Sequence, residues 1–168
     1  MLFGDFVLAS GRHSTYYLDC RRTTMHAEGL DLVGRLGLEA VRLRGWAPDV
    51  VGGLTLGADP VAYAVARASC VTPPLVSAFT VRKTAKAHGA GRRIEGCFEP
   101  GMPVVVVEDV VTTGASALEA AAAVRAAGGT VCGVLAVVDR EEGGREAIER
   151  EGYAVRTLVT LAELLHTP

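Results

Sequence analysis

The sequence lacks the long apolar runs and the leader-like start that mark membrane-spanning and exported proteins. Acidic or basic residues interrupt every apolar stretch before it reaches the roughly 18 residues that cross a bilayer. The first six residues have neither a basic start nor a long apolar centre, as a signal peptide would. We therefore expect a cytoplasmic protein with no membrane partner.

Paired cysteines and an excess of positive charge are also missing. Cys20, Cys70, Cys97 and Cys132 form no C-x-x-C pair, so we interpret them as small core residues, not zinc ligands or disulfide partners. Lys and Arg number 17 and Asp and Glu 19, for a net charge of −2. That balance offers no overall attraction to nucleic acid, and we expect no nucleic-acid partner.

Neither common nucleotide-binding motif occurs. The glycine-rich residues 52–57 are followed by Ala58 and Asp59, where a P-loop needs Lys and Ser or Thr, and no G-x-G-x-x-G opens a helix. ATPase and dehydrogenase functions are therefore disfavoured. The turn at residues 52–60 has backbone amides that could hold a diphosphate, although an ordinary strand-to-helix turn is the alternative.

The apolar pattern predicts one α/β domain over residues 1–168. With 168 residues, 49% of them hydrophobic, the chain can bury a single ordinary core. Valine-rich segments read as buried strands and alternate with segments of helical spacing, an order typical of an open, mostly parallel sheet flanked by helices. The expected strands are 49–53, 75–81, 104–107, 131–138 and 154–160, and the expected helices are 27–44, 58–68, 116–127 and 161–165.

The strongest chemical signal lies in residues 104–116. A valine strand runs through Glu108 and Asp109 into a turn rich in Thr, Gly and Ser that opens a helix. Backbone amides of residues 112–116, their hydroxyls and the positive end of the helix would hold a phosphate. The two acids could accept hydrogen bonds from sugar hydroxyls or help to bind Mg²⁺. A sugar phosphate satisfies both halves, while a simple helix cap is the alternative.

Two further features suggest an anionic ligand. Residues 82–93 hold five fixed positive charges and no acid, and their glycines are typical of a loop that closes over a polyphosphate; a solvated basic loop is the alternative. Arg140 follows a buried strand and could pair with a substrate carboxylate. A local pair with Asp139 or Glu142 is equally compatible with the sequence.

Together these residues resemble the type I phosphoribosyltransferases and, among them, the orotate phosphoribosyltransferase family. The resemblance is carried by residues 104–116, by the substrate segment at 6–17, by the loop pattern Arg82-Lys83-x-x-Lys86-x-His88-Gly89 and by Asp139-Arg140. It implies the type I phosphoribosyltransferase fold, with a small N-terminal segment on the substrate side. It also implies transfer of ribose 5-phosphate from phosphoribosyl pyrophosphate (PRPP) to orotate, which yields orotidine 5'-monophosphate and pyrophosphate in pyrimidine synthesis.

The resemblance also assigns roles to residues of this sequence. It implies Lys86, His88 and Asp109 as catalytic residues, Thr112 and Arg140 as orotate contacts, and a homodimer in which Lys83 is shared across the interface. Mg²⁺ would be the cofactor, held mainly by PRPP without a protein metal site. The implied PRPP contacts are Arg82, Lys83, Lys86, His88, Glu108, Asp109, Val110, Val111, Thr112, Thr113, Gly114, Ala115 and Ser116. The alternatives are a transferase for another base and a non-catalytic PRPP-sensing regulator.

Overall fold

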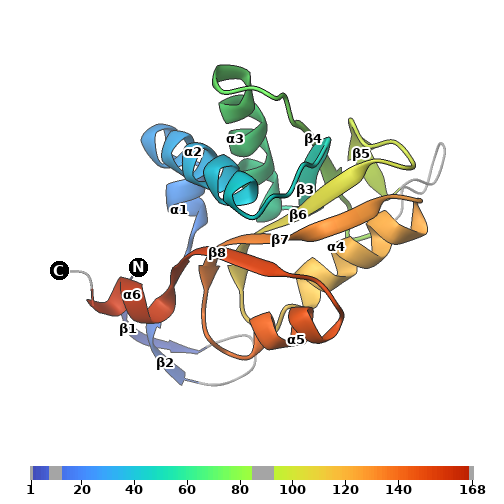
Figure 1. Cartoon of the computed structure of the whole chain (residues 1–168). Coiled ribbons are helices and arrows are strands. Elements are labelled where there is room, and N and C mark those ends of the chain that lie inside the picture. The colour runs from blue at the N-terminus through green and yellow to red at the C-terminus, as the bar shows by residue number, and fades with distance from the viewer. Residues whose placement is uncertain (1, 8–12, 85–92, 167–168) are drawn as a thin grey trace.

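The computed structural model describes residues 2–7, 13–84 and 93–166, and its centre is a six-stranded sheet (Figure 1). The strand order is β5-β4-β3-β6-β7-β8, and all neighbours are parallel except the antiparallel pair β4 and β5. The strands are β3 (Val50–Leu54), β4 (Ser77–Val81), β5 (Ile94–Gly96), β6 (Pro103–Val111), β7 (Thr130–Asp139) and β8 (Val155–Thr160). The predicted open, mostly parallel sheet is confirmed.

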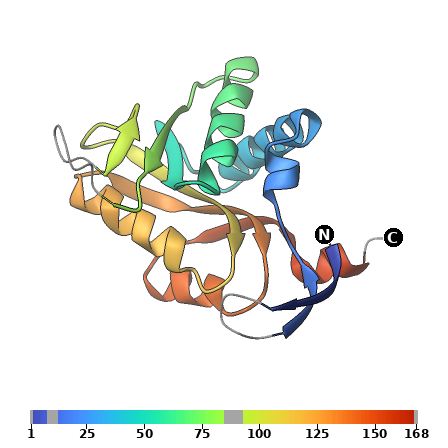
Figure 2. The ribbon, with the colours of Figure 1, turned by 180° about the vertical axis from the view of Figure 1, so that it is seen from behind.

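Helices cover both faces of this sheet. Helices α2 (Ala27–Leu43) and α3 (Ala58–Val71) lie on one face, and α4 (Ala115–Ala126) and α5 (Gly144–Arg150) lie on the other (Figures 1 and 2). The alternation of β6 explains this arrangement, because successive side chains of a strand point to opposite faces. Val105 and Val107 pack in the cluster with α2 and α3, whereas Val104 and Val106 pack in the cluster with α4.

Three smaller elements complete the described chain. Strands β1 (Leu2–Val7) and β2 (His13–Tyr17) form a separate antiparallel hairpin, which both views place beside the short helix α6 (Leu161–His166) (Figures 1 and 2). A one-turn helix, α1 (Arg21–Thr24), then leads into α2. The sequence predicted a small N-terminal segment but not its hairpin form.

The direction of winding reverses between β3 and β6. From β3 the chain passes through α3, on one face, to β4; from β6 it passes through α4, on the opposite face, to β7 on the other side. The two connections therefore leave a crevice beyond the carboxyl ends of β3 and β6. Open α/β sheets bind ligands at such a switch point, so the topology alone indicates where a site should be.

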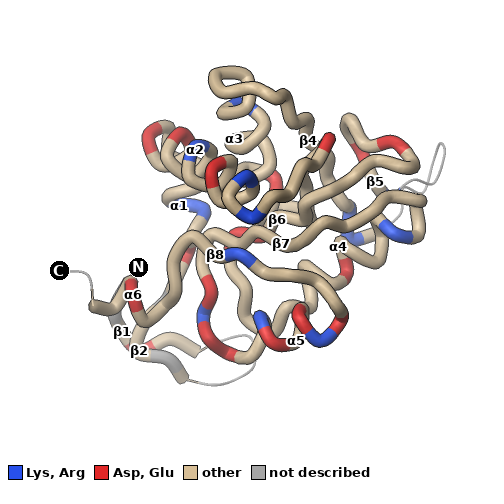
Figure 3. Tube along the Cα trace, in the orientation of Figure 1, with Lys and Arg blue, Asp and Glu red and all other residues tan. Residues whose placement is uncertain are grey.

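Several expectations need correction or comment. Cys20 is buried and Cys132 half-buried, but Cys70 and Cys97 are exposed, so the prediction of four core cysteines is wrong for two of them. Strand β6 extends to Val111, four residues beyond its expected end. Figure 3 shows charges of both signs interspersed on α2 and α5. Within the described ranges, no helix is both long and apolar enough to cross a bilayer.

Candidate active site

A cavity of about 390 Å³ opens at the crevice between β3 and β6. Its volume falls within the range of small-molecule sites, roughly 300–1,000 Å³. Five segments far apart in the sequence meet there: the start of α1, the turn after β3, Lys83 after β4, the end of β6 with the turn that follows it, and Arg140 after β7. The lining residues are Leu18, Asp19, Cys20, Arg21, Leu54, Thr55, Leu56, Gly57, Lys83, Glu108, Asp109, Val110, Thr112, Ser116 and Arg140.

The two acids of β6 reach this cavity in different environments. Glu108 is buried, and one of its carboxyl oxygens, Oε2, has no hydrogen-bond partner in the described structure. Burial, with the neighbouring Asp109 as a lesser cause, raises the pKa of Glu108 to about 8. At neutral pH Glu108 is therefore mainly protonated and can both donate and accept a hydrogen bond. Asp109 is more open to the cavity.

The β6–α4 turn, residues 112–116, has the geometry of a phosphate site. Gly114 precedes α4 with a left-handed φ of 81°, a conformation that glycine adopts without strain. Gly114 has no side chain to cap α4, and the Ala115 amide donates to the Thr113 hydroxyl at 3.5 Å. This first turn of α4 borders a depression lined by Glu108 and residues 110–117. Amides at the positive end of a 12-residue helix favour an anion.

The β3–α3 turn, residues 55–57, faces the acids from across the crevice. A Cβ on Gly57 would overlap the carboxylate of Asp109, so the backbone here approaches the acid more closely than any other residue would allow. The peptide bond between Thr55 and Leu56 is cis. The Thr55 hydroxyl donates to the buried Asp59 at 2.7 Å. The turn whose backbone amides were suggested by the sequence to hold a diphosphate therefore borders the cavity.

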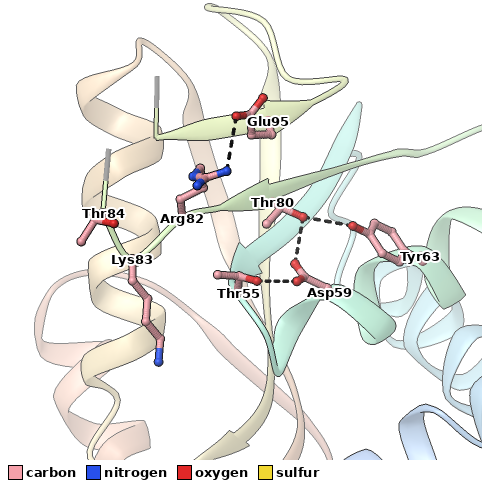
Figure 4. A pocket seen from close by; sticks show the side chains of 8 residues that line it. All are labelled: Thr55, Asp59, Tyr63, Thr80, Arg82, Lys83, Thr84 and Glu95. Atoms are coloured by element: carbon pink, nitrogen blue, oxygen red, sulfur yellow. Dashed lines mark hydrogen bonds and ion pairs between the residues drawn. The ribbon is translucent and has the colours of Figure 1, made fainter. Parts of the chain in front are cut away.

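The basic segment divides into side chains with different surroundings. Lys83 lines the cavity of its own chain. Arg82 instead lines a neighbouring cavity of about 520 Å³, where its Nη1 lies 3.8 Å from Oε1 of Glu95. Figure 4 shows this ion pair. Arg93 donates to Glu119 and to the backbone oxygens of Arg82 and Lys83. It therefore links the start of the basic segment to α4. The predicted residues Lys86 and His88 lie outside the described residues.

Arg140 lines the cavity and forms the local one of its two predicted pairings. Its Nη2 is 2.8 Å from a carboxylate oxygen of Glu142, so the local ion pair exists. Its Nε is nevertheless buried without a hydrogen-bond partner among the described residues, and the side chain lines the cavity. The guanidinium also lies 5.7 Å from the ring centroid of Tyr16 in β2. A donor left unpaired at a cavity wall is suited to a ligand acceptor.

The structure brings most of the predicted site residues together. Glu108, Asp109 and residues 110–116 border the cavity or its phosphate depression, and Lys83 and Arg140 stand on the rims. Sequence reasoning missed residues 18–21, which form one wall without any recognisable motif. Among them, burial and the nearby Asp109 raise the pKa of the Cys20 thiol to about 12. It therefore stays protonated and is not a nucleophile.

Within the described part of the chain, no three His, Cys, Asp or Glu side chains gather as a metal site. The cavity instead has carboxyl groups from one strand, amides from a helix terminus and cations on its rims. Such a set suits a ligand that carries both hydroxyl groups and anions. A sugar phosphate with a second anionic group has this chemistry.

Comparisons with known proteins agree with this geometry. No family model matches the chain. The curated orotate phosphoribosyltransferase of Aquifex aeolicus is 52% identical over 160 residues, which cover 95% of this chain and 86% of that protein. The Mycobacterium tuberculosis orotate phosphoribosyltransferase in complex with Fe(III) dicitrate superposes with a TM-score of 0.87 at 50% identity, covering 97% of this chain and 90% of the other.

A second structure of the Mycobacterium tuberculosis enzyme holds PRPP. It has a TM-score of 0.80 at 49% identity and covers 88% of this chain and 82% of the other. Identity near one half over almost the whole chain, with the same fold, establishes common family membership. This chain belongs to the orotate phosphoribosyltransferase family.

Proposed function

We propose that the chain transfers ribose 5-phosphate from PRPP to orotate, a step in the synthesis of UMP. A ring nitrogen of orotate forms a bond to the anomeric carbon of the ribose while the bond from that carbon to pyrophosphate breaks. The observation that carries the proposal is the crevice itself: it joins two buried-strand acids, a helix-terminal phosphate turn and an arginine with an unpaired Nε.

The β6–α4 turn fixes the sugar end of PRPP. The 5-phosphate binds the amides and hydroxyls of residues 112–116, and the ribose hydroxyls bind Glu108 and Asp109 just before them. The unpaired Oε2 of Glu108 supports this assignment, because a buried acceptor without a partner is costly unless a ligand satisfies it. Positive charge that develops on the ribose during the reaction is stabilised by the carboxylate of Asp109.

The two rims hold the other reacting groups. Arg140 binds the carboxylate of orotate, and Thr112 contacts the base. The diphosphate lies toward the β3–α3 turn and Lys83, with Lys86 and His88 stabilising or protonating it as it leaves. Arg82 lines the neighbouring cavity, so its predicted diphosphate contact requires its side chain to turn away from Glu95.

Mg²⁺ is part of this proposal as the partner of PRPP. The chain fits this mode, because Asp109 lines the cavity where the sugar would lie and offers carboxylate oxygens, which Mg²⁺ prefers as ligands. Bound to PRPP, Mg²⁺ would screen the charge of the diphosphate.

Because PRPP and its products are highly charged and do not cross a bilayer unaided, we propose a cytoplasmic location.

The direct test follows the loss of orotate absorbance with purified protein, PRPP and Mg²⁺, omitting each component in turn. Turnover that needs all three supports the proposal. Turnover only when orotate is replaced by adenine, guanine or uracil would identify a transferase for another base. PRPP binding with no pyrophosphate release from any base would identify a PRPP-sensing regulator.

We also propose a homodimer that shares Lys83 between active sites. Leu56 and Tyr63 support it as apolar side chains that are 57% and 53% exposed at the start of α3, beside the two cavities. Because Lys83 also lines the cavity of its own chain, the sharing needs a specific test. Lys83→Ala and Asp109→Asn chains are inactivated separately and then mixed. If the mixture recovers activity, Lys83 acts in the site of the other subunit. If heterodimers form but no activity is recovered, Lys83 acts in the site of its own chain.

A further inference from the structure

Two threonine hydroxyls behind the active-site crevice donate to the buried carboxylate of Asp59, and a tyrosine extends this network. The Thr55 hydroxyl donates to Oδ2 at 2.7 Å, and the Thr80 hydroxyl donates to Oδ1 at 2.8 Å. The Tyr63 hydroxyl lies 3.2 Å from Thr80 Oγ1. Figure 4 shows this chain of contacts, which joins the β3–α3 turn, the first turns of α3 and strand β4.

The donors and acceptors define a direction. A threonine hydroxyl has a single proton, and Thr80 donates its proton to Asp59. Tyr63 must therefore donate to Thr80 in its turn. Asp59 is the common acceptor, with one carboxylate oxygen for each threonine. Asparagine has the same length, but its amide group has only one acceptor oxygen and a nitrogen that donates.

The network ends on the two segments assigned to the diphosphate. Thr55 begins the β3–α3 turn, whose Gly57 touches Asp109, and its amide also donates to the Val81 oxygen at 2.8 Å. Thr80 lies in β4, three residues before Lys83, which lines the active-site cavity. Asp59 does not itself line that cavity, but its amide donates to the oxygen of Leu56, which does, at 3.3 Å. Its effect on a ligand there passes through Thr55, Leu56 and Thr80.

We propose that Asp59 is a positioning residue for PRPP: it holds the β3–α3 turn and the start of the basic segment at a fixed separation, which suits the diphosphate. This inference rests on the proposed function, which brings a diphosphate between those two segments. A buried carboxylate held by two hydroxyls is costly to place unless both bonds persist, so the spacing that they define is firmly maintained.

The first variants are Asp59→Ala and Thr55→Val, compared by their separate effects on PRPP and orotate. We expect each to raise the KM for PRPP about tenfold, with kcat and the KM for orotate changed by about twofold or less, since each loses a charge-assisted hydrogen bond behind the diphosphate. Asp59→Asn retains one acceptor oxygen and should be intermediate. Thr55→Val added to Asp59→Ala should have almost no further effect, because both remove the same link.

The matched control is Ser69→Ala, at the other end of the same helix. The Ser69 hydroxyl is buried, donates to the Ala66 oxygen at 2.7 Å and accepts from the Val76 amide at 2.9 Å. Its loss should lower the melting temperature as much as Asp59→Ala does but leave the KM for PRPP unchanged. If the two variants behave alike in both measurements, Asp59 is merely structural and the proposal is wrong.

A binding measurement separates this inference from the proposed reaction. PRPP raises the melting temperature of the wild-type protein if it binds the folded state, and this readout needs no orotate turnover. We expect a smaller rise for Thr55→Val and Asp59→Asn, both of which keep the size of the side chain. An undiminished rise in both variants would overturn the proposal even if orotate proves to be the substrate, and it remains decisive if Asp59→Ala fails to fold.

Discussion

The two turns that face each other across the crevice are built in opposite ways. The β6–α4 turn is local: its acids, hydroxyls, glycine and helix terminus all lie within residues 108–116. The β3–α3 turn offers only Thr55, Leu56 and Gly57 to the cavity. Its position depends on Asp59 in α3 and on Thr80 and Val81 in β4, more than 20 residues away from Thr55 in sequence.

The two turns should therefore tolerate substitutions differently. Backbone amides and a left-handed glycine form the phosphate turn, so substitutions that alter its backbone should be most damaging. Hydrogen bonds from behind hold the diphosphate turn, so its function should decline in smaller steps as individual bonds are lost. Variants on either side of the crevice can therefore be compared directly.

The largest effect is expected from Gly114→Ala in the phosphate turn. An alanine at this position would have to adopt a φ of 81°, and its Cβ would lie 2.7 Å from the Gly144 oxygen. The turn must therefore shift away from its present backbone conformation. We expect kcat/KM for PRPP to fall about 100-fold. Gly143→Ala is the control, because Gly143 has a φ of 88° but open space around its Cβ. An equal loss in both variants would mean that backbone strain alone, not the phosphate turn, is responsible.

The second-largest effect is a loss of folding stability with rising pH, caused by the buried Glu108. Its pKa of about 8 in the folded protein exceeds the ordinary value of 4.5, so the folded state keeps a proton that the unfolded chain has released. The stabilisation from this group is complete below pH 4.5 and is lost as the pH rises toward 8. Glu108→Gln cannot ionise, so its stability relative to wild type should rise by about 2 kcal/mol between pH 6 and pH 8.

Urea unfolding of both proteins across that pH range measures this difference. Asp109→Asn, on the neighbouring residue, should reduce this change with pH without abolishing it, because Asp109 is a lesser cause of the raised pKa of Glu108. A constant gap between Glu108→Gln and wild type would show that Glu108 is already ionised at pH 6.

The sequence was sufficient for the local half of this site and for most of the fold. Valine runs predicted the central strands and their order with the helices, and residues 104–116 indicated the phosphate turn because its parts are contiguous. The end of β6 was placed too early, since Glu108 and Asp109 are polar; the strand continues because Val110 and Val111 still pair with Val138 and Asp139.

The features that depend on tertiary contacts escaped prediction. Asp59 looks like an ordinary first-turn acid of a helix until Thr55 and Thr80 are brought to it. Arg93 was one of five fixed positive charges in a segment without an acid, yet it pairs with Glu119 in α4. Residues 18–21 have no chemical pattern and reach the cavity only because the chain passes between the hairpin and α2.

Arg140→Ala should have a smaller effect than Gly114→Ala, limited to the second substrate. Arg140 lines the cavity, and its loss removes the charged partner that we propose for the orotate carboxylate. We expect the KM for orotate to rise about 20-fold and that for PRPP by no more than about twofold. Glu142→Gln, which keeps the arginine but weakens its ion pair, is the control and should not raise the KM for orotate. A defect mainly in PRPP binding would contradict the assignment of Arg140.

The smallest of these effects is expected from Gly57→Ala, on the turn held by Asp59. The added methyl group meets only the Asp109 carboxylate, which lies at the end of a side chain that can rotate away. We therefore expect the KM for PRPP to rise about fivefold. In the Asp59→Asn background, where the turn is held less firmly, the same methyl group should cost less. A loss as large as that of Gly114→Ala would mean that the β3–α3 turn is as rigid as the phosphate turn, and the contrast between them would fail.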